Sequence, residues 1–138
     1  NETIRILLAD DHAMFRAGIR SVLEKHPRFQ VVAEAEDGQA TVRLALELAP
    51  DVVLMDVSMP LLNGIEATRQ IRAQLPDTRV VALSMHSDRQ FVSEIFKAGG
   101  SEYLLKNSAA MELPIAIEAA ANIPLRQEMT SPSSVRAQ

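Results

Sequence analysis

The chain has 138 residues, a length that suits one domain with a sizeable core and leaves no room for a second full domain. Its formal net charge of -4, without a cluster of lysine and arginine, argues against direct binding to nucleic acid. The absence of cysteine excludes disulfides, thiolate metal sites and cysteine nucleophiles. Because the apolar runs are far shorter than the roughly 20 residues that cross a bilayer and no signal peptide opens the chain, we expect a cytoplasmic protein without a membrane partner.

Short apolar, β-branched runs alternate with segments of helical period along the chain. The expected strands are Ile4 to Ala9, Phe29 to Ala35, Val52 to Met55, Arg79 to Leu83 and Glu102 to Leu105. The apolar stripes of the expected helices span Phe15 to Leu23, Val42 to Ala49, Ile65 to Ile71, Phe91 to Phe96 and Leu113 to Ala120. This alternation predicts an α/β fold in which helices cover both faces of a five-stranded parallel sheet.

Proline and glycine mark the ends of the expected helices. Three prolines lie just before strands: Pro27, Pro50 and Pro76. Gly99 and Gly100 end the fourth helix in the same way. Pro114 conflicts with the pattern, since it lies inside the fifth helical stretch and removes a backbone hydrogen bond there. We therefore expect that helix to begin late or to kink.

The domain is expected to span residues 1–123, with residues 124–138 forming a linker or tail. The helical pattern ends near Pro124, and the run from Thr130 to Ser134 has the composition of a linker. Because the first residue is Asn1 and not methionine, we expect a processed chain or a fragment of a longer one.

Acidic residues and one lysine lie directly after three of the apolar runs. Asp10 and Asp11 follow the first run, Asp56 the third and Lys106 the fifth. The carboxyl ends of parallel strands meet at one edge of a sheet, so these side chains are expected to converge. Carboxylate oxygens suit Mg²⁺, and a metal with a lysine can neutralise the charge of a phosphoryl group. The pattern thus predicts a magnesium and phosphoryl site.

Asp56 is the best nucleophile of the set, because it stands alone at a strand end before a loop suited to a tight turn. That loop contains Met59, Pro60 and Gly64. Ser84, at the end of the fourth strand, can donate its hydroxyl to a phosphoryl oxygen.

Each of these residues also has an ordinary structural interpretation. Asp10 and Asp11 suit a helix N-cap, Asp56 a turn, Ser84 a strand-end hydroxyl and Lys106 a solvated side chain. Their joint placement at one sheet edge favours the functional interpretation. For the histidines His12 and His86 we favour the ordinary interpretation over a role as metal ligand or acid and base.

Taken in order, the motifs resemble the response-regulator receiver domain over roughly residues 4 to 121. The residues that carry the resemblance are Asp10, Asp11, Asp56, Met59, Pro60, Gly64, Ser84, Tyr103 and Lys106. Two segments are similar to the receivers of LuxR-type transcription regulators: Ala9-Asp10-Asp11-His12 and Leu83-Ser84-Met85-His86. The resemblance implies a doubly wound, flavodoxin-like sheet with strand order 2-1-3-4-5.

The resemblance also implies a mechanism. A sensor histidine kinase phosphorylates Asp56, and Lys106 pairs with the phosphoryl group. Mg²⁺ is held by Asp11, Asp56 and the backbone carbonyl of Ser58, with Asp10 reaching it through water. Ser84 then moves toward the phosphoryl group and the ring of Tyr103 turns inward, which changes the face of the fourth helix, fifth strand and fifth helix.

Output and partners are expected to follow the same family. The apolar residues Phe91, Ile95 and Phe96 are expected to form a docking surface on the changed face. Glu102 stands where the family usually has glycine, and this departure and Pro114 concern the output face and dimerisation, leaving the active-site groups intact. DNA is expected as a partner only through a helix-turn-helix domain beyond the 138 residues, and a second copy of the chain is an optional partner.

Four alternatives remain open at this point. A receiver that only binds its partners, without phosphorylation, is one, but the intact Asp56 and Lys106 argue against it. A single-domain phosphorelay regulator needs no DNA-binding domain. A phosphatase of the haloacid-dehalogenase type also uses an aspartyl nucleophile with magnesium, but places it after the first strand in an Asp-x-Asp pattern. A flavin-binding domain of similar topology needs a phosphate-binding loop after the first strand, where Asp10 and Asp11 repel phosphate.

Overall fold

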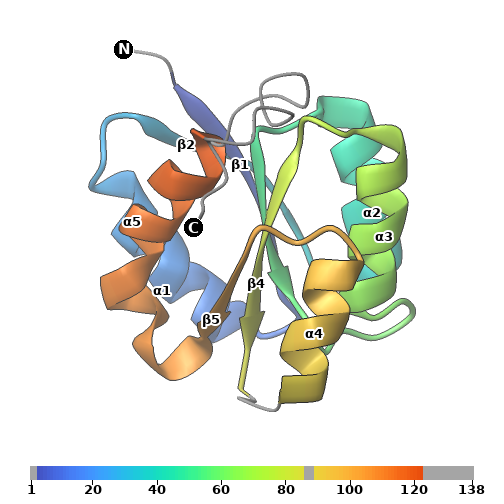
Figure 1. The fold of residues 1–138 in the computed structure, drawn as a ribbon. Helices are drawn as coiled ribbons and strands as arrows, with labels where there is room; N and C mark the ends of the chain where they lie inside the picture. The colour runs from blue at the N-terminus through green and yellow to red at the C-terminus, as the bar shows by residue number, and fades with distance from the viewer. Residues whose placement is uncertain (1–2, 86–88, 123–138) are drawn as a thin grey trace, which may run out of the picture.

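A computed structural model describes residues 3–85 and 89–122, in which strand and helix alternate along the chain (Figure 1). The strands are β1 (Ile4–Ala9), β2 (Phe29–Ala35), β3 (Val52–Asp56), β4 (Arg79–Ser84) and β5 (Glu102–Leu105). The helices are α1 (Ala13–Glu24), α2 (Gly38–Leu48), α3 (Gly64–Gln74), α4 (Arg89–Lys97) and α5 (Ala109–Ala121), with a 3-10 turn η1 (Lys106–Ser108). The predicted strands are confirmed, with β3 and β4 one residue longer than expected. His86 and the expected tail over residues 124–138 lie outside the described residues.

The strands form one sheet in the order β2-β1-β3-β4-β5, and every neighbouring pair is parallel. This confirms the doubly wound, flavodoxin-like topology. The register sets Ala9 beside Met55 and Asp56 beside Leu83, so the carboxyl ends of β1, β3 and β4 finish at nearly the same level. Residues that directly follow these strands are therefore neighbours in space.

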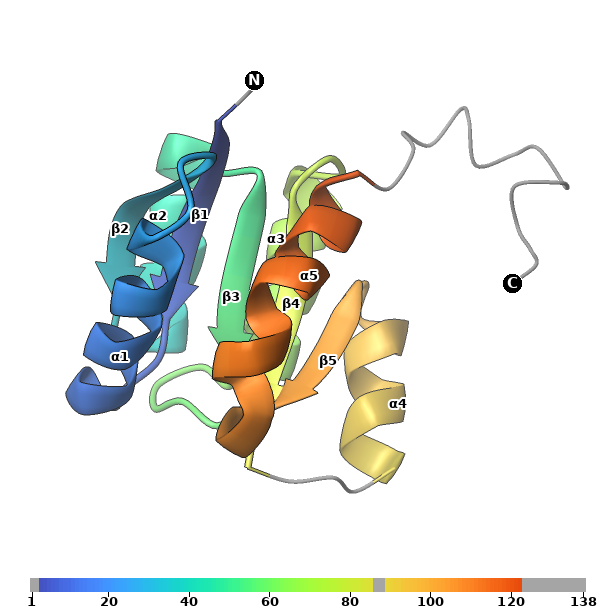
Figure 2. The same cartoon turned by 90° about the vertical axis from the view of Figure 1, so that its left-hand side faces the viewer.

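Helices cover both faces of the sheet, α1 and α5 on one side and α2, α3 and α4 on the other (Figures 1 and 2). The alternation of side chains along β1 explains this arrangement. Ile6 and Leu8 pack into the core beneath α1 and α5, whereas Leu7 and Ala9 pack into the core beneath α2 and α3. All four are fully buried, which accounts for the continuous apolar runs in the sequence.

In the part of the chain that the structure describes, two helices begin with a side-chain cap. Asp37 accepts a hydrogen bond from the N–H of Ala40 at the start of α2, and Asn63 accepts one from Glu66 at the start of α3. Helix α1 differs, because His12 occupies its N-cap position and its side chain makes no capping bond. The ordinary interpretation of Asp10 and Asp11 as the N-cap of α1 is therefore wrong.

Helix α5 begins at Ala109 and continues to Ala121 with Pro114 inside it. Of the two expected outcomes, a late start or a kink, the late start is wrong. Pro114 has no N–H to donate to the carbonyl of Ala110, four residues earlier. The apolar side chains of α5 offset that loss: Leu113 and Ile117 are fully buried against the sheet.

The apolar residues of α4 do not form one exposed surface. Ile95 is fully buried with Val57 and Ala82, and Phe91 packs against the same cluster. Only Phe96 is well exposed, at 46%. The expected docking surface of Phe91, Ile95 and Phe96 is thus corrected, because most of its apolar area holds α4 on the sheet.

Candidate functional site

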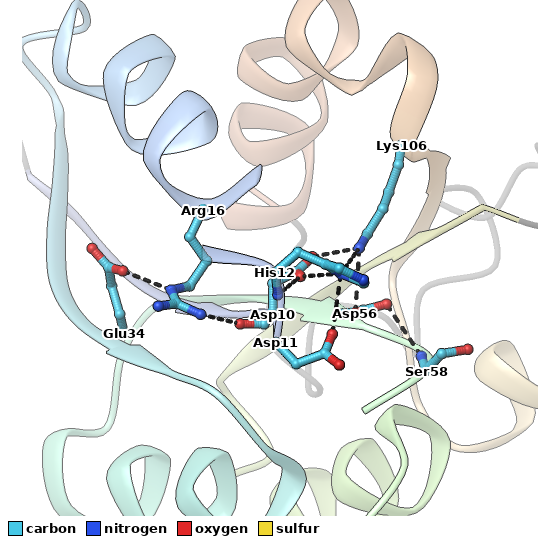
Figure 3. A network of polar contacts seen from close by, with 8 residues as sticks. All are labelled: Asp10, Asp11, His12, Arg16, Glu34, Asp56, Ser58 and Lys106. Carbon is cyan, nitrogen blue, oxygen red and sulfur yellow. Dashed lines mark hydrogen bonds and ion pairs between the residues drawn. The ribbon is translucent and has the colours of Figure 1, made fainter. Parts of the chain in front are cut away.

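The predicted site residues meet at the carboxyl edge of the sheet, and they come from four different segments. Asp10 and Asp11 follow β1, Asp56 ends β3, Ser84 ends β4 and Lys106 opens η1 after β5. Figure 3 shows the side chains of Asp10, Asp11, Asp56 and Lys106 pointing toward one another. The parallel order of the strands produces this convergence, as the sequence predicts.

Lys106 lies between two buried carboxylates. Its Nζ is 2.7 Å from Asp10 Oδ2 and 3.3 Å from Asp56 Oδ2. Its Nζ also lies 4.6 Å from the centre of the Phe15 ring, a cation–π contact that fixes the ammonium from a third side. Lys106 is buried, and these contacts hold its charge in place.

Burial and repulsion make Asp56 a poor anion when no cation beyond Lys106 is close. The residue is only 2% exposed, and Asp10 is fully buried beside it. Burial first, and then the charge of Asp10, raise the pKa of Asp56 to about 6, against the opposing effects of Lys106 and of the Ser58 N–H. The negative charges of Asp10 and Asp56 therefore repel each other, and both depend on the single ammonium of Lys106.

Two carboxylate oxygens of the site are left without a hydrogen bond. Among the described residues, nothing donates with hydrogen-bond geometry to Asp10 Oδ2 or Asp56 Oδ2, although both face the ammonium of Lys106. Buried polar atoms normally have such partners, so these oxygens are available to a further cation.

The loop after β3 is held close to Asp56. The Ser58 N–H donates to Asp56 Oδ1 over 3.1 Å, and the Gly64 N–H donates to the carbonyl of Val57 over 2.8 Å. A Cβ on Gly64 would lie only 2.3 Å from the backbone oxygen of Asp56, so this approach requires glycine. Met59 is buried beneath the loop. The tight turn predicted from Met59, Pro60 and Gly64 thus positions the Asp56 carboxylate.

Ser84 and Tyr103 lie on the two neighbouring strands. Ser84 is buried at the end of β4, one residue beyond the pairing of Leu83 with Asp56. Tyr103, in the middle of β5, is half-buried and packs against the cluster of Val57, Ala82 and Ile95. Ser84 therefore lies at the sheet edge that carries the site, and Tyr103 lies against the cluster that holds α4.

His12 also belongs to the cluster, although the sequence favoured an ordinary interpretation for it. Its Nδ1 lies 3.0 Å from Asp10 Oδ1, 3.1 Å from Asp11 Oδ1 and 3.3 Å from Lys106 Nζ (Figure 3). The side chain is 63% exposed and covers the acidic groups from the solvent side. A hollow lined by His12, Phe15, Met85, Lys106 and Asn107 opens beside it.

Arg16 was missed at the sequence level, and it holds the chain that carries Asp10. Its guanidinium donates to the Asp10 carbonyl over 2.5 Å and to Glu34 Oε1 over 2.9 Å (Figure 3). Burial favours the neutral form of Glu34, but hydrogen bonds from Arg16 and Arg20 outweigh it and lower the pKa of that carboxyl. The sequence feature that could have indicated this role is the position of Arg16, one helical turn after His12.

The donor set fits a small divalent cation. Ligand atoms from Asp10, Asp11, His12 and Asp56 all lie within 4.8 Å of one another. Carboxylate oxygens are the ligands that Mg²⁺ prefers, and the two residues with an oxygen that lacks a hydrogen bond, Asp10 and Asp56, belong to this group. The arrangement can therefore hold a cation next to the Asp56 carboxylate and the Lys106 ammonium.

Known proteins resemble this chain over most of its length. Residues 6–118 match the response regulator receiver domain family. The chain is 44% identical to the transcriptional regulatory protein DegU of Brevibacillus brevis over 86% of this chain and 50% of that protein. It is 48% identical to the transcriptional regulatory protein LiaR of Bacillus subtilis over 85% of this chain and 56% of that protein. The chain thus spans about half the length of these relatives.

Solved structures agree with the fold. A LuxR-family two-component response regulator from Aurantimonas sp. SI85-9A1 is 43% identical, with a TM-score of 0.83 over 87% of this chain and 86% of that one. The non-phosphorylated receiver domain of the stress response regulator RcsB from Escherichia coli is 29% identical, with a TM-score of 0.79 over 86% of this chain and 92% of that one.

Within residues 3–85 and 89–122, every helix is too short or too polar to cross a bilayer. The family match over residues 6–118 includes the acidic cluster and every strand except the first two residues of β1. It excludes the haloacid-dehalogenase and flavin-binding alternatives. The chain belongs to the response-regulator receiver domain family of two-component systems, with relatives among the LuxR-type transcription regulators.

Proposed function

We propose that this receiver accepts a phosphoryl group on Asp56 from the phosphohistidine of a cognate sensor kinase. One observation carries the proposal: the Asp56 carboxylate is buried in an acidic cluster with one oxygen 3.3 Å from Lys106 Nζ. A carboxylate held beside a fixed ammonium faces the position where the charge of a phosphoryl group develops.

In the proposed transfer, an oxygen of Asp56 attacks phosphorus as the phosphorus–nitrogen bond of the phosphohistidine breaks. The electron pair of that bond goes to the leaving imidazole, which takes up a proton, and an acyl phosphate forms on Asp56. Lys106 then pairs with a phosphoryl oxygen. Because Lys106 already contacts Asp10 and Asp56, it needs little rearrangement to do so. Attack of water on the same phosphorus later releases phosphate, and this hydrolysis is the only other reaction we assign to the chain.

Asp10, Asp11 and Asp56, with the backbone carbonyl of Ser58, would hold Mg²⁺. The fit is supported by the clustered carboxylates and by the two buried oxygens without hydrogen bonds. When bound, Mg²⁺ supplies positive charge that offsets the charge of the phosphoryl oxygens. The residues around it prepare the site: Lys106 balances one of the buried charges, and the Ser58 N–H orients Asp56.

We propose that Ser84 and Tyr103 pass the phosphorylated state to the rest of the domain. The Ser84 hydroxyl turns toward the phosphoryl group, and the Tyr103 ring moves further into the space beside α4. The packing of Tyr103 against the cluster that holds α4 supports this route, since a shift of the ring alters the seat of that helix.

For the whole protein, we propose control of transcription through a DNA-binding domain outside these 138 residues. The relatives DegU and LiaR are named as transcriptional regulatory proteins and are about twice as long as the matched region. Because a sensor kinase makes its phosphohistidine from ATP, we place the reaction in the cytoplasm. Assembly with a second copy of the chain stays a prediction.

The test is chemical phosphorylation of the untagged protein with acetyl phosphate and Mg²⁺, followed by intact mass spectrometry. We expect one phosphoryl adduct that is stable in acid and labile in base, absent from the D56N variant and absent when EDTA replaces Mg²⁺. The matched control is D51N, which changes an exposed aspartate at the opposite end of β3 and should leave the adduct intact. An adduct that persists in D56N contradicts the assignment.

A further inference from the structure

The Nδ1 atom of His12 has neighbours whose demands conflict. Asp10 Oδ1 at 3.0 Å, which already accepts from the backbone N–H of His12 over 2.7 Å, and Asp11 Oδ1 at 3.1 Å can only accept, whereas Lys106 Nζ at 3.3 Å can only donate. A protonated Nδ1 can donate to one carboxylate but then faces the ammonium, and an unprotonated Nδ1 faces two carboxylate oxygens. Neither tautomer lets Nδ1 bond to all three neighbours.

A cation between His12 Nδ1, Asp10 Oδ1 and Asp11 Oδ1 resolves the conflict, because each of these atoms then directs a lone pair to the cation. In octahedral coordination with metal–ligand distances near 2.1 Å, neighbouring ligand atoms lie roughly 3.0 Å apart. The separations of His12 Nδ1 from Asp10 Oδ1 and Asp11 Oδ1 match that edge. His12 is thus already spaced as a ligand.

A second observation points to a cation at this place. Asp10 is fully buried and Asp56 is 2% exposed, and the Oδ2 of each faces Lys106 Nζ, at 2.7 and 3.3 Å, without hydrogen-bond geometry to any described residue. Their ligand atoms belong to the same group of four as His12. Lys106 neutralises only part of this negative charge. The remaining negative charge would attract a dication beside the lysine.

The chemistry of the imidazole decides which ions gain from His12. Mg²⁺ favours oxygen and gains little from a nitrogen ligand. First-row transition ions bind imidazole well, with affinity rising from Mn²⁺ through Co²⁺ to Ni²⁺. A site with one imidazole among carboxylates therefore discriminates between the two classes of ion.

We propose that His12 Nδ1 is a metal ligand in this receiver, so that the acidic cluster binds octahedral first-row transition dications with His12 and binds Mg²⁺ without it, through the oxygen ligands assigned above. The inference deepens the proposed function, because it concerns the ion that accompanies Asp56. If His12 is a ligand, the identity of the ion at the site depends on the concentrations of both transition metal and magnesium.

The experiment is calorimetric titration of the untagged protein, separately with Ni²⁺ and with Mg²⁺. The variants are H12A, the conservative H12Q, and D11N, which removes a ligand common to both ions. The matched control is H26A, because His26 stacks on Phe29 and is not a member of the cluster. Thermal unfolding checks that each variant is folded.

We expect H12A and H12Q to weaken Ni²⁺ binding by about tenfold or more and Mg²⁺ binding by less than about threefold. D11N should weaken both ions, and H26A neither. Equal effects of H12A on both ions, or no effect on Ni²⁺, overturn the proposal, since a merely structural role of His12 gives no selective loss.

The acetyl phosphate assay with Mg²⁺ separates this inference from the proposed function. If the wild type takes up a phosphoryl group while H12A retains full Ni²⁺ affinity, the metal inference alone fails. If no adduct forms on Asp56 but Ni²⁺ binding depends on His12, the proposed function alone fails.

Discussion

At the scale of single residues, Asp56 carries a conflict between folding and chemistry. Its pKa is raised to about 6 in the metal-free fold, against a value near 3.9 for an unperturbed aspartate. Between these two pH values the folded chain binds more protons than the unfolded chain, so stability falls as the pH rises through that window. Above about pH 6 the full cost is present. The residue that we propose as phosphoacceptor therefore destabilises the empty receiver at neutral pH.

We predict that D56N stabilises the metal-free protein at pH 7 by about 1 to 3 kcal/mol, because asparagine removes a buried charge that is repelled by Asp10. At pH 5, near the middle of the window, about half of this difference should remain, because the unfolded chain has by then largely lost the proton that folded Asp56 still holds. Urea unfolding of both proteins at the two pH values, with EDTA, measures this.

The control for this prediction is D77N, which changes an exposed aspartate in the loop before β4. It should leave the free energy of unfolding nearly unchanged at both pH values. A D56N variant that is less stable than the wild type, or equally more stable at pH 5 and pH 7, contradicts the assigned cause.

At the scale of elements, the close contact between the start of α3 and the end of β3 holds the site in shape. Gly64 is buried, and an added Cβ would lie 2.3 Å from the Asp56 oxygen and 2.8 Å from Val57 Cα. These are backbone atoms, which cannot turn aside as a flexible side chain can. The contact thus couples the position of α3 to that of Asp56.

We predict that G64A lowers the free energy of unfolding by about 2 kcal/mol or more, because the strand and the helix must separate. The matched variant G18A, in the exposed middle of α1, meets nothing within 4 Å and should raise it by about 0.5 to 1 kcal/mol through helix propensity. Urea unfolding gives both values. A lower free energy of unfolding for G64A with a higher one for G18A supports the contact. If both variants are more stable than the wild type, the contact is contradicted.

The elements also separate what the sequence could predict from what it could not. Strand runs and helical stripes are local patterns, so the strands were placed to within one residue and the convergence of Asp10, Asp56 and Lys106 followed from parallel topology. The side chain of His12 depends on contacts with Lys106, 94 residues away, which no local pattern encodes. The face of α4 was misjudged for the same reason, because a stripe containing Ile95 can be buried or exposed.

At the scale of the whole molecule, cation binding and folding are linked through the acidic cluster. Any ion that binds only the folded chain stabilises it by mass action, and at ten times its dissociation constant the gain is about 1.4 kcal/mol. Here the ion also relieves the repulsion between Asp10 and Asp56 that the empty fold contains. The cluster lies at the ends of β1 and β3, which are interior strands of the sheet, so the bound ion holds these two strands together.

We predict that Mg²⁺ raises the unfolding temperature of the wild type at pH 7, and that D11N loses most of this gain because it removes a carboxylate of the cluster. The gain should shrink at pH 5, since an ion must displace the proton that the raised pKa of Asp56 retains there. Thermal unfolding with Mg²⁺, and with NaCl at equal ionic strength as the control, measures both effects. If NaCl gives the same gain, general screening of the net charge of -4 explains the stabilisation and a bound cation does not.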